Sequence, residues 1–335
     1  MARRKEHSIR DVADMAGCSI GTVSRAFNGY EVSPAIKAQI GKAVEKLNYI
    51  PLTASKPSSV RGRDVLILVD DKISDRSSWT QMVLFNALRI LGDFGYRSRI
   101  EFRNQSNTEI SEHLRNADAC IVWGGFKEEL YSAIATKCRN MPIISYSREI
   151  PYENAISIFS KDKNSMSQLV SHLIASRHRK IGLVTYSKIQ KNEARYEGFY
   201  ETMSAFDCQV NNKWMVADSD FQPAVPGYNS TKKILRGEHP TAIVYGADIL
   251  ALGGMEAIKR SGFGIPEDIS VVSFDDLPES STTFPPLTTM KLDTVALATL
   301  MVESLEKLLL GRTHDRKLFI ERQLIQRESV GICKG

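Results

Sequence analysis

The 335-residue chain has little cysteine and lacks long apolar stretches. None of its five cysteines belongs to a CxxC pair, so disulfide frameworks and zinc fingers are not expected; they are Cys18, Cys120, Cys138, Cys208 and Cys333. No run of about 18 apolar residues occurs, and the first residues, MARRKEHS, hold no apolar signal segment. The sequence therefore predicts a reduced, cytoplasmic protein without a membrane span.

Several common enzyme signatures are missing as well. The chain holds neither a P-loop nor an HExxH sequence, and no Cys/His pair stands in a suggestive context. An α/β enzyme would need a site that these motifs do not mark. We therefore expect no catalytic residue, no metal and no cofactor.

Positive charge is concentrated at the N-terminus. Residues 1–63 hold eleven Lys and Arg against five Asp and Glu, a net charge of +6. The other 272 residues carry 33 bases and 34 acids, so the overall charge of +5 hides a neutral body. A basic module on a neutral body favours a nucleic-acid or membrane-surface partner.

The first fifty residues predict three short helices, at 9–16, 20–28 and 34–47. Ser8 and Asp11 have the spacing of a capping box, with Asp in place of the usual Glu. Ser19 can cap the second helix, and Ser33 followed by Pro34 opens the third.

The first two of these helices fit a helix-turn-helix. Ala13 is small, and Gly17, four residues later, can take the positive φ of a tight turn. Apolar residues that would join the helices are Val12, Ala16, Cys18, Val23 and Ala26. In this motif the start of the second helix enters the major groove of DNA.

That geometry predicts which side chains read DNA. Residues 20–22 would approach bases, Arg25 would reach guanine or a phosphate, and Ser19 and Ser24 would contact phosphates. The full predicted set is Ser8, Ser19, Ile20, Gly21, Thr22, Ser24, Arg25, Asn28 and Tyr49. The alternative is a helical hairpin that only packs as core. The alanine–glycine spacing, the N-terminal position and the local charge favour DNA binding.

Residues 52–63, LTASKPSSVRGR, have almost no apolar anchor and predict a linker. Beyond them, short apolar runs alternate with amphipathic stretches. Strands are predicted at 65–69, 119–123, 142–146, 180–186, 242–245 and 269–274, and helices at 82–94, 164–176, 193–205 and 249–261. This βαβα alternation predicts parallel sheets covered by helices, and its length favours two similar subdomains.

The N-terminal segment SIRDVADMAGCSIGTVSRAFNG is followed by distinctive segments at 46–51, 178–182, 195–199, 248–253, 269–276 and 284–289. In this order, these motifs resemble the LacI/GalR family of bacterial repressors. The resemblance implies an all-α helix-turn-helix headpiece and an α/β body of two parallel-sheet, periplasmic-binding-protein-like subdomains. It places the headpiece at 1–50, the hinge at 51–63, the N-terminal subdomain at 64–160 and 293–316, and the C-terminal subdomain at 161–292 and 317–335.

Polar residues that follow the predicted strands indicate an effector site in the cleft between the two subdomains. The predicted set is Trp79, Ser147, Arg148, Arg195, Phe221, Asp248 and Asp275. Carboxylates accept from vicinal hydroxyls, a guanidinium donates a fork, and an aromatic ring covers a sugar face, so a sugar-like ligand fits. Asp248 could equally be only a helix cap, and Arg195 only a solvated helix residue.

Two departures from the family pattern affect this expectation. Ser147 and Arg148 stand where many sugar-responsive relatives have an aspartate, and an inward Arg148 would favour a sugar phosphate. The predicted hinge residues are Pro51, Ser55, Pro57 and Ser58. Since relatives have a hinge helix there, and proline breaks helices, we expect that helix to be short, displaced or absent.

Together these features predict a repressor of a sugar-utilisation operon. A homodimer would bind a pseudo-palindromic double-stranded DNA operator, and a sugar or sugar phosphate would change its affinity. The alternative is a solute-binding sensor or receptor without a DNA role. That reading predicts a signal peptide and no basic headpiece, so the sequence disfavours it.

Overall fold

The computed structural model describes most of the chain. The described residues are 8–27, 32–47, 49, 62–70, 78–103, 114, 116–124, 141–150, 152–186, 193–217, 226–312 and 315–334. The predicted hinge residues, together with Asn28 and Phe221, lie outside them. No helix in the described ranges is long and apolar enough to cross a membrane.

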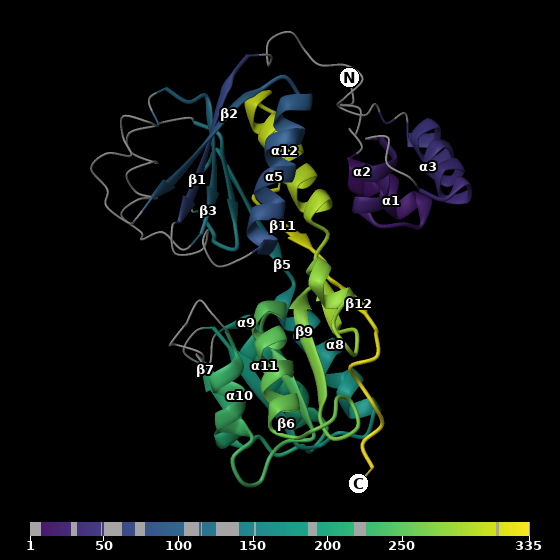
Figure 1. Cartoon of the computed structure of the whole chain (residues 1–335). Helices are drawn as coiled ribbons and strands as arrows, with labels where there is room; N and C mark the ends of the chain where they lie inside the picture. Colours follow the sequence, from purple (N-terminus) through teal and green to yellow (C-terminus); the bar gives the residue numbers. More distant parts are fainter. Residues whose placement is uncertain are drawn as a thin grey trace. The chain divides into compact units, whose positions relative to one another are not determined.

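The chain forms two compact units (Figure 1). Unit 1 comprises residues 1–159 and 293–320, and unit 2 comprises residues 160–292 and 321–335. The last boundary falls four residues later than the sequence indicated. The reason is that residues 317–320 form a strand in the sheet of unit 1.

Unit 1 begins with a three-helix headpiece of α1 (Ile9–Ala16), α2 (Ile20–Phe27) and α3 (Pro34–Leu47). Its core gathers the apolar faces of all three helices around Val12, Val23 and Ile40. Cys18 and Ala26 pack against this core, as the sequence predicted. Three starts and two ends of these helices agree with the predicted ranges.

The rest of unit 1 is a six-stranded sheet with the order β11-β5-β4-β3-β1-β2. Its elements are β1 (Asp64–Asp70), α5 (Ser78–Asp93), β2 (Arg97–Arg103), β3 (Ala119–Trp123), β4 (Ile143–Tyr146), β5 (Ala155–Ser160), α12 (Thr294–Leu309) and β11 (Lys317–Ile320). Strands β1 to β5 pair in parallel. Helices α5 and α12 pack against each other, and α12 also contacts β3 and β4.

Unit 2 has a second six-stranded sheet, with the order β12-β10-β9-β8-β6-β7. Its elements are α8 (Asp162–Ala175), β6 (Ile181–Thr185), α9 (Ala194–Ala205), η1 (Asn212–Trp214), β7 (Met215–Ala217), α10 (Tyr228–Ile234), β8 (Ala242–Tyr245), α11 (Asp248–Arg260), β9 (Ser270–Asp275), η2 (Pro278–Ser281), β10 (Thr288–Lys291) and β12 (Gln323–Ile325). All pairs are parallel except β10 with β12.

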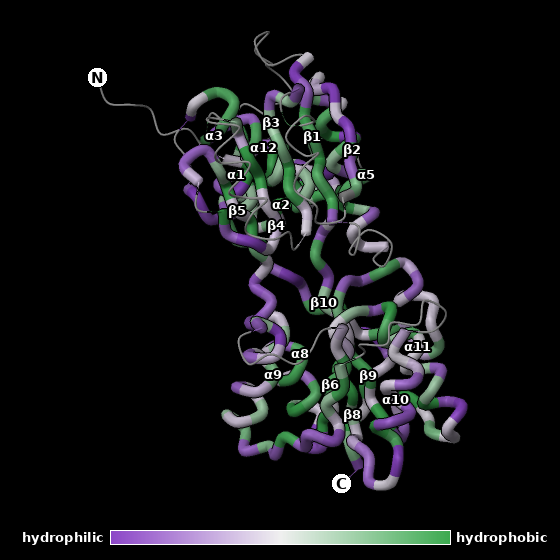
Figure 2. The backbone as a smooth tube through the Cα atoms, turned by 90° about the vertical axis from the view of Figure 1, so that its left-hand side faces the viewer, coloured by the Kyte–Doolittle hydropathy of each residue, from purple (hydrophilic) through white to green (hydrophobic). Residues whose placement is uncertain are grey.

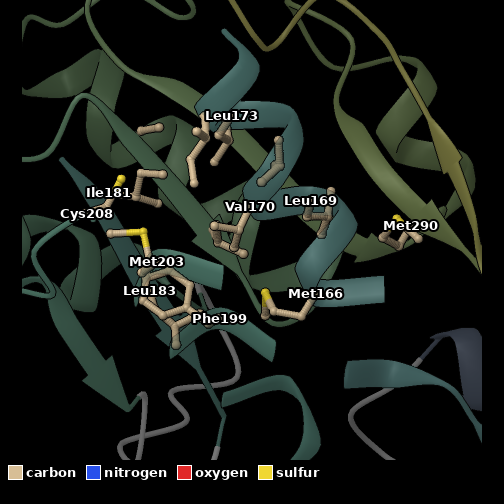
Figure 3. Close-up of a cluster of buried hydrophobic side chains, with 14 of the residues drawn as sticks. Met166, Leu169, Val170, Leu173, Ile181, Leu183, Phe199, Met203, Cys208 and Met290 are labelled. Atoms are coloured by element: carbon tan, nitrogen blue, oxygen red, sulfur yellow. The ribbon is translucent and has the colours of Figure 1, made fainter. Parts of the chain in front are cut away.

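Alternating side chains bury both faces of the unit 2 sheet. Leu183 of β6 and Val244 of β8 point into the cluster that α8 and α9 cover, shown in Figure 3. Their neighbours Val184 and Ile243 belong to the opposite cluster, which α11 completes. Burial on both faces explains why these strands read as continuous apolar runs, visible as green tube in Figure 2.

Candidate functional site

The turn between α1 and α2 has the geometry that the sequence predicted. Ser8 and Asp11 form a reciprocal capping box, with the Ser8 backbone N–H 2.6 Å from Asp11 Oδ2. Gly17 takes the left-handed conformation, at φ 65°, and the Cys18 N–H donates to the Ala13 carbonyl at 3.0 Å. This cap ends α1 sharply and sets the direction in which α2 begins.

Ser19 starts α2 as its cap. Its Oγ accepts from the Thr22 N–H at 3.1 Å and lies 2.8 Å from the Thr22 hydroxyl. Residues 17–21 also spell GCSIG, the spacing of a serine-hydrolase nucleophile elbow. That motif needs a turn from a strand into a helix, whereas Ser19 stands between two helices.

The predicted DNA-binding residues differ in their exposure. Ser19 is exposed, and Ile20, Thr22 and Arg25 are half-buried. Three others are buried in this structure: Gly21, Ser24 and Tyr49. The burial of these three comes from contacts between α2 and α12 and from the headpiece core.

A charged cluster lies in unit 2, where the N-terminal ends of α8 and α9 meet the end of β9. Arg195 Nε donates to Asp162 Oδ2 at 2.9 Å, and Arg322 Nε donates to Asp162 Oδ1 at 2.9 Å. Arg322 also lies 3.6 Å from Asp275. Both guanidiniums cover the Phe274 ring, at 4.5 Å for Arg195 and 5.5 Å for Arg322.

Burial and the attraction between opposite charges act against each other in this cluster. Burial by itself raises the pKa of Asp162, but Arg195 and Arg322 hold it well below its usual value. Burial disfavours the charged form of Arg195, yet Asp162 and Asp275 raise its pKa above the ordinary value. For Asp275, burial outweighs both arginines and raises the pKa. Of the two carboxyls, Asp275 is therefore the one whose pKa burial raises, whereas that of Asp162 is lowered.

The loop after β9 is set by two residues at positive φ, Asp275 at 116° and Asp276 at 56°. Arg327 donates to Asp276 at 2.5 Å and to the Leu287 carbonyl at 2.7 Å. Left-handed backbone is uncommon outside glycine and is often kept where it aims a functional group. Here it turns the Asp275 carboxylate toward Arg322 and Arg195.

The sequence predicted that Asp248 contacts the effector, but in the structure its carboxylate serves as an acceptor for other groups of the chain. It has no exposed surface, and its two oxygens accept from four groups of the chain. These donors are the hydroxyls of Ser273, Ser280 and Thr289 and the N–H of Leu277. Burial and the nearby Asp275 raise its pKa to about 6. Asp248 thus ties α11, β9, η2 and β10 together beneath the Asp275 loop.

The predicted effector residues of unit 1 gather at the ends of its parallel strands. Trp79, at the start of α5, packs against Trp123 and Tyr146, with ring centroids 5.7 and 5.9 Å away. Ser147 follows β4 at φ 63° and is exposed, and Arg148 is half-buried. The structure therefore divides the predicted set, with Trp79, Ser147 and Arg148 in one unit and Arg195, Asp248 and Asp275 in the other.

Sequence reasoning missed Asp162, Arg322 and Trp123. Asp162 opens α8 directly after β5, a strand that was not predicted, and a carboxylate at such a helix start is a recognisable signal. Trp123 ends a predicted strand, so its position could have been noticed. Arg322 is 160 residues from its partner Asp162, and no local pattern marks it. Within the described ranges no group of His, Cys, Asp and Glu could hold a metal ion.

Gly198 sets the distance between α8 and α9, and therefore the position of Arg195. A Cβ at Gly198 would overlap the Lys163 carbonyl and lie 2.9 Å from Met166 Cβ. We expect Gly198→Ala to destabilise the protein by about 1–3 kcal/mol through overpacking, measured by thermal unfolding. Gly92→Ala is the matched control, because open space surrounds Gly92 in α5. An unchanged melting temperature in Gly198→Ala would contradict the close helix contact.

The chain combines a helix-turn-helix headpiece with two α/β units built on largely parallel sheets. This combination defines a class of protein, the DNA-binding regulators whose body has the fold of a solute-binding protein. Comparison with family models agrees. Residues 8–52 match the model described as bacterial regulatory proteins, lacI family, and residues 170–330 match a periplasmic binding protein-like domain. Residues 8–52 are thus similar to the DNA-binding domain of the lacI family, and the chain is a DNA-binding transcriptional regulator.

Relatives with assigned names span nearly the whole chain. The ribose operon repressor of Haemophilus influenzae is 26% identical, over 96% of this chain and 98% of its own length. The transcriptional repressor PurR of Aliivibrio salmonicida is also 26% identical, with the same coverage. Among solved structures, a lac repressor dimer bound to operator and the anti-inducer ONPF is 25% identical, covering 98% of this chain and all of that chain, with a TM-score of 0.69.

Proposed function

We propose that the chain is an effector-responsive repressor of a sugar-utilisation operon. It acts as a cytoplasmic homodimer on a pseudo-palindromic operator, and it has no enzymatic role. The observation that carries this proposal is the capped α1–α2 turn, which presents Ser19, Thr22 and Arg25 along one short helix. The concentration of positive charge in residues 1–63 supports the same conclusion.

The effector is proposed to bind at the charged cluster of unit 2. Arg195 and Asp275 are the contacting groups, and Asp162 and Arg322 hold them in place. A guanidinium donor beside a carboxylate acceptor suits a polyhydroxylated molecule, because vicinal hydroxyls both accept and donate. A sugar or sugar phosphate is therefore the proposed class, as the names of the ribose operon repressor and of a transcriptional regulator–cellobiose complex also suggest for those two proteins.

Operator affinity changes only if the effector binds one conformation of the protein better than another. The buried hydrogen bonds of Asp248 support a link between effector binding and a change of conformation in unit 2. It fixes the loop that carries Asp275 to three further elements, so a ligand that moves this loop moves them together.

Selection from a library of random DNA duplexes tests the proposal. Full-length protein is expected to enrich duplexes with two related half-sites in inverted orientation, about one helical turn or a multiple of it apart. The enriched sequence, called the selected duplex below, then serves as the probe for affinity measurements. A library from which the protein enriches nothing over a no-protein control would contradict the proposal.

A further inference from the structure

The DNA-reading helix α2 packs against α12 of its own chain. The Ser24 hydroxyl lies 2.8 Å from that of Thr299, and this pair is buried. Arg25 Nη1 donates to Asp293 Oδ2 at 2.7 Å, at the start of α12. Two of the residues predicted to read DNA therefore have partners on the body of unit 1.

Gly21 allows the two helices to approach closely. A Cβ at Gly21 would overlap the Asp293 carboxylate and lie 3.2 Å from Ala296 Cβ. Gly21 itself is buried, whereas Ser19, two residues earlier, is exposed. The face of α2 that meets α12 is thus the face carrying Gly21, Ser24 and Arg25.

Two further contacts hold the headpiece on unit 1. Tyr49 follows α3, and its hydroxyl hydrogen-bonds with Glu303 of α12. Arg10 of α1 donates to the Phe319 carbonyl in β11. Contacts from α1, α2 and the end of the headpiece converge on α12 and β11, so the arrangement involves the whole module.

The contacts imitate features of a nucleic-acid partner. Asp293 offers Arg25 a carboxylate oxygen, as a DNA phosphate or a guanine edge offers an acceptor. Ser24, predicted to contact a phosphate, instead pairs with a hydroxyl and is only 1% exposed. Because Gly21 and Ser24 are buried in the contact with α12, DNA cannot occupy the same face of α2 while the helix is docked.

We propose that α12 is a docking surface for the chain's own recognition helix, and that the docked headpiece is an autoinhibited state that cannot bind DNA. This inference rests on the proposed DNA-binding function. Release of α2 from Asp293 and Thr299 precedes operator binding. Any influence that weakens the docking contact raises operator affinity, without changing a residue that touches DNA.

Two substitutions in α12 and its cap test the inference. Asp293→Asn keeps the acceptor that caps α12 through the Val295 and Ala296 N–H groups, but removes the charge that faces Arg25. Thr299→Val keeps the shape of the side chain and removes the hydroxyl that pairs with Ser24. Glu238→Gln is the control, since it removes one carboxylate charge from an exposed ion pair with Lys180 in unit 2.

The double variant Asp293→Asn/Thr299→Val is measured in two ways. Amide hydrogen exchange of residues 20–27 is expected to be faster than in the wild type, because the helix has lost its docking partner. Affinity for the selected duplex is expected to rise about fivefold or more, a usual size for coupling of this kind. Glu238→Gln should change neither quantity beyond the small effect of its charge on affinity.

If the wild type binds its duplex and the double variant binds no tighter, the autoinhibition is overturned. A wild type that selects no duplex would instead contradict the proposed function.

A covalent lock gives a second test, in which Ser24→Cys/Thr299→Cys is oxidised with copper–phenanthroline. The locked protein should lose DNA binding, and dithiothreitol should restore it to the affinity of the Ser24→Cys single variant, which forms no lock, while Thr299→Cys alone keeps binding throughout. Full binding by the locked protein would also overturn the inference.

Discussion

Arg25→Ala is expected to weaken binding to the selected duplex by about 1–3 kcal/mol for each headpiece. Two headpieces on one operator make this a loss of roughly 30-fold or more. Arg25 is the predicted main base-reading group on α2, and we expect its loss to outweigh the release of α2 from Asp293 that the same change produces. Fluorescence anisotropy with the labelled duplex measures the change.

Lys42→Ala provides the control for Arg25→Ala. Lys42 is exposed on α3, so its removal takes away the same charge without touching α2. Its loss should weaken binding slightly and equally for all sequences, because it acts only through the phosphate backbone. Equal effects of the two substitutions would remove Arg25 from the base-reading set.

Arg195→Ala is expected to abolish the effector response and leave DNA binding intact. A charged hydrogen bond of this kind contributes about 1.5–3 kcal/mol, so the affinity for the effector should fall roughly 10-fold to 150-fold. Thermal unfolding with ribose, ribose 5-phosphate, cellobiose and gluconate finds compounds that stabilise the wild type. The same compounds should shift the melting temperature of Arg195→Ala much less.

Arg260→Ala is the matched control for Arg195→Ala. Arg260 is an exposed residue of α11 that pairs with Glu256 one turn away, so its loss should leave every thermal shift unchanged. A normal thermal shift in Arg195→Ala would remove Arg195 from the effector site. A shift lost equally in both variants would mean that the response reflects general charge rather than this cluster.

The elements that the sequence predicted best have strong local signals. Ser8 with Asp11, and Gly17, mark the two ends of α1, and Ser19 marks the start of α2; each behaves in the structure as its residue type indicates. The buried strands β1, β3, β6, β8 and β9 read as apolar runs, and each was predicted to within two residues at either end. The sequence was sufficient in these places because each cap or buried strand depends on residues that are close together in the chain.

The elements that were missed have weak or misleading patterns. Strand β2, RSRIEFR, alternates charged with apolar residues at the edge of its sheet, so it lacks an apolar run. Strand β12 is three residues long and pairs antiparallel with β10. Helix α12 has a local start signal, the capping side chain of Asp293, that was not recognised in the sequence.

Only part of the charged cluster could be predicted, because some of its contacts join residues that are far apart in the sequence. Arg195 and Asp275 follow predicted strands, and the rule that ligands bind at strand ends identifies them. Asp248 follows the same rule, but its environment makes it a buried acceptor, which only packing reveals. Arg322 reaches Asp162 through the return of the chain at residue 321, and that return depends on the whole fold.

The salt dependence of binding to the selected duplex tests the central claim, that the basic headpiece reads DNA, most directly. Anisotropy titrations with the selected duplex and a scrambled one are run from 50 to 200 mM KCl. Affinity should fall by roughly 10³-fold to 10⁵-fold over this range if two headpieces contact six to ten phosphates. The selected duplex should bind at least about 10³-fold tighter than the scrambled one at each concentration. Equal affinity for both duplexes, or binding that does not change with salt, would contradict the account.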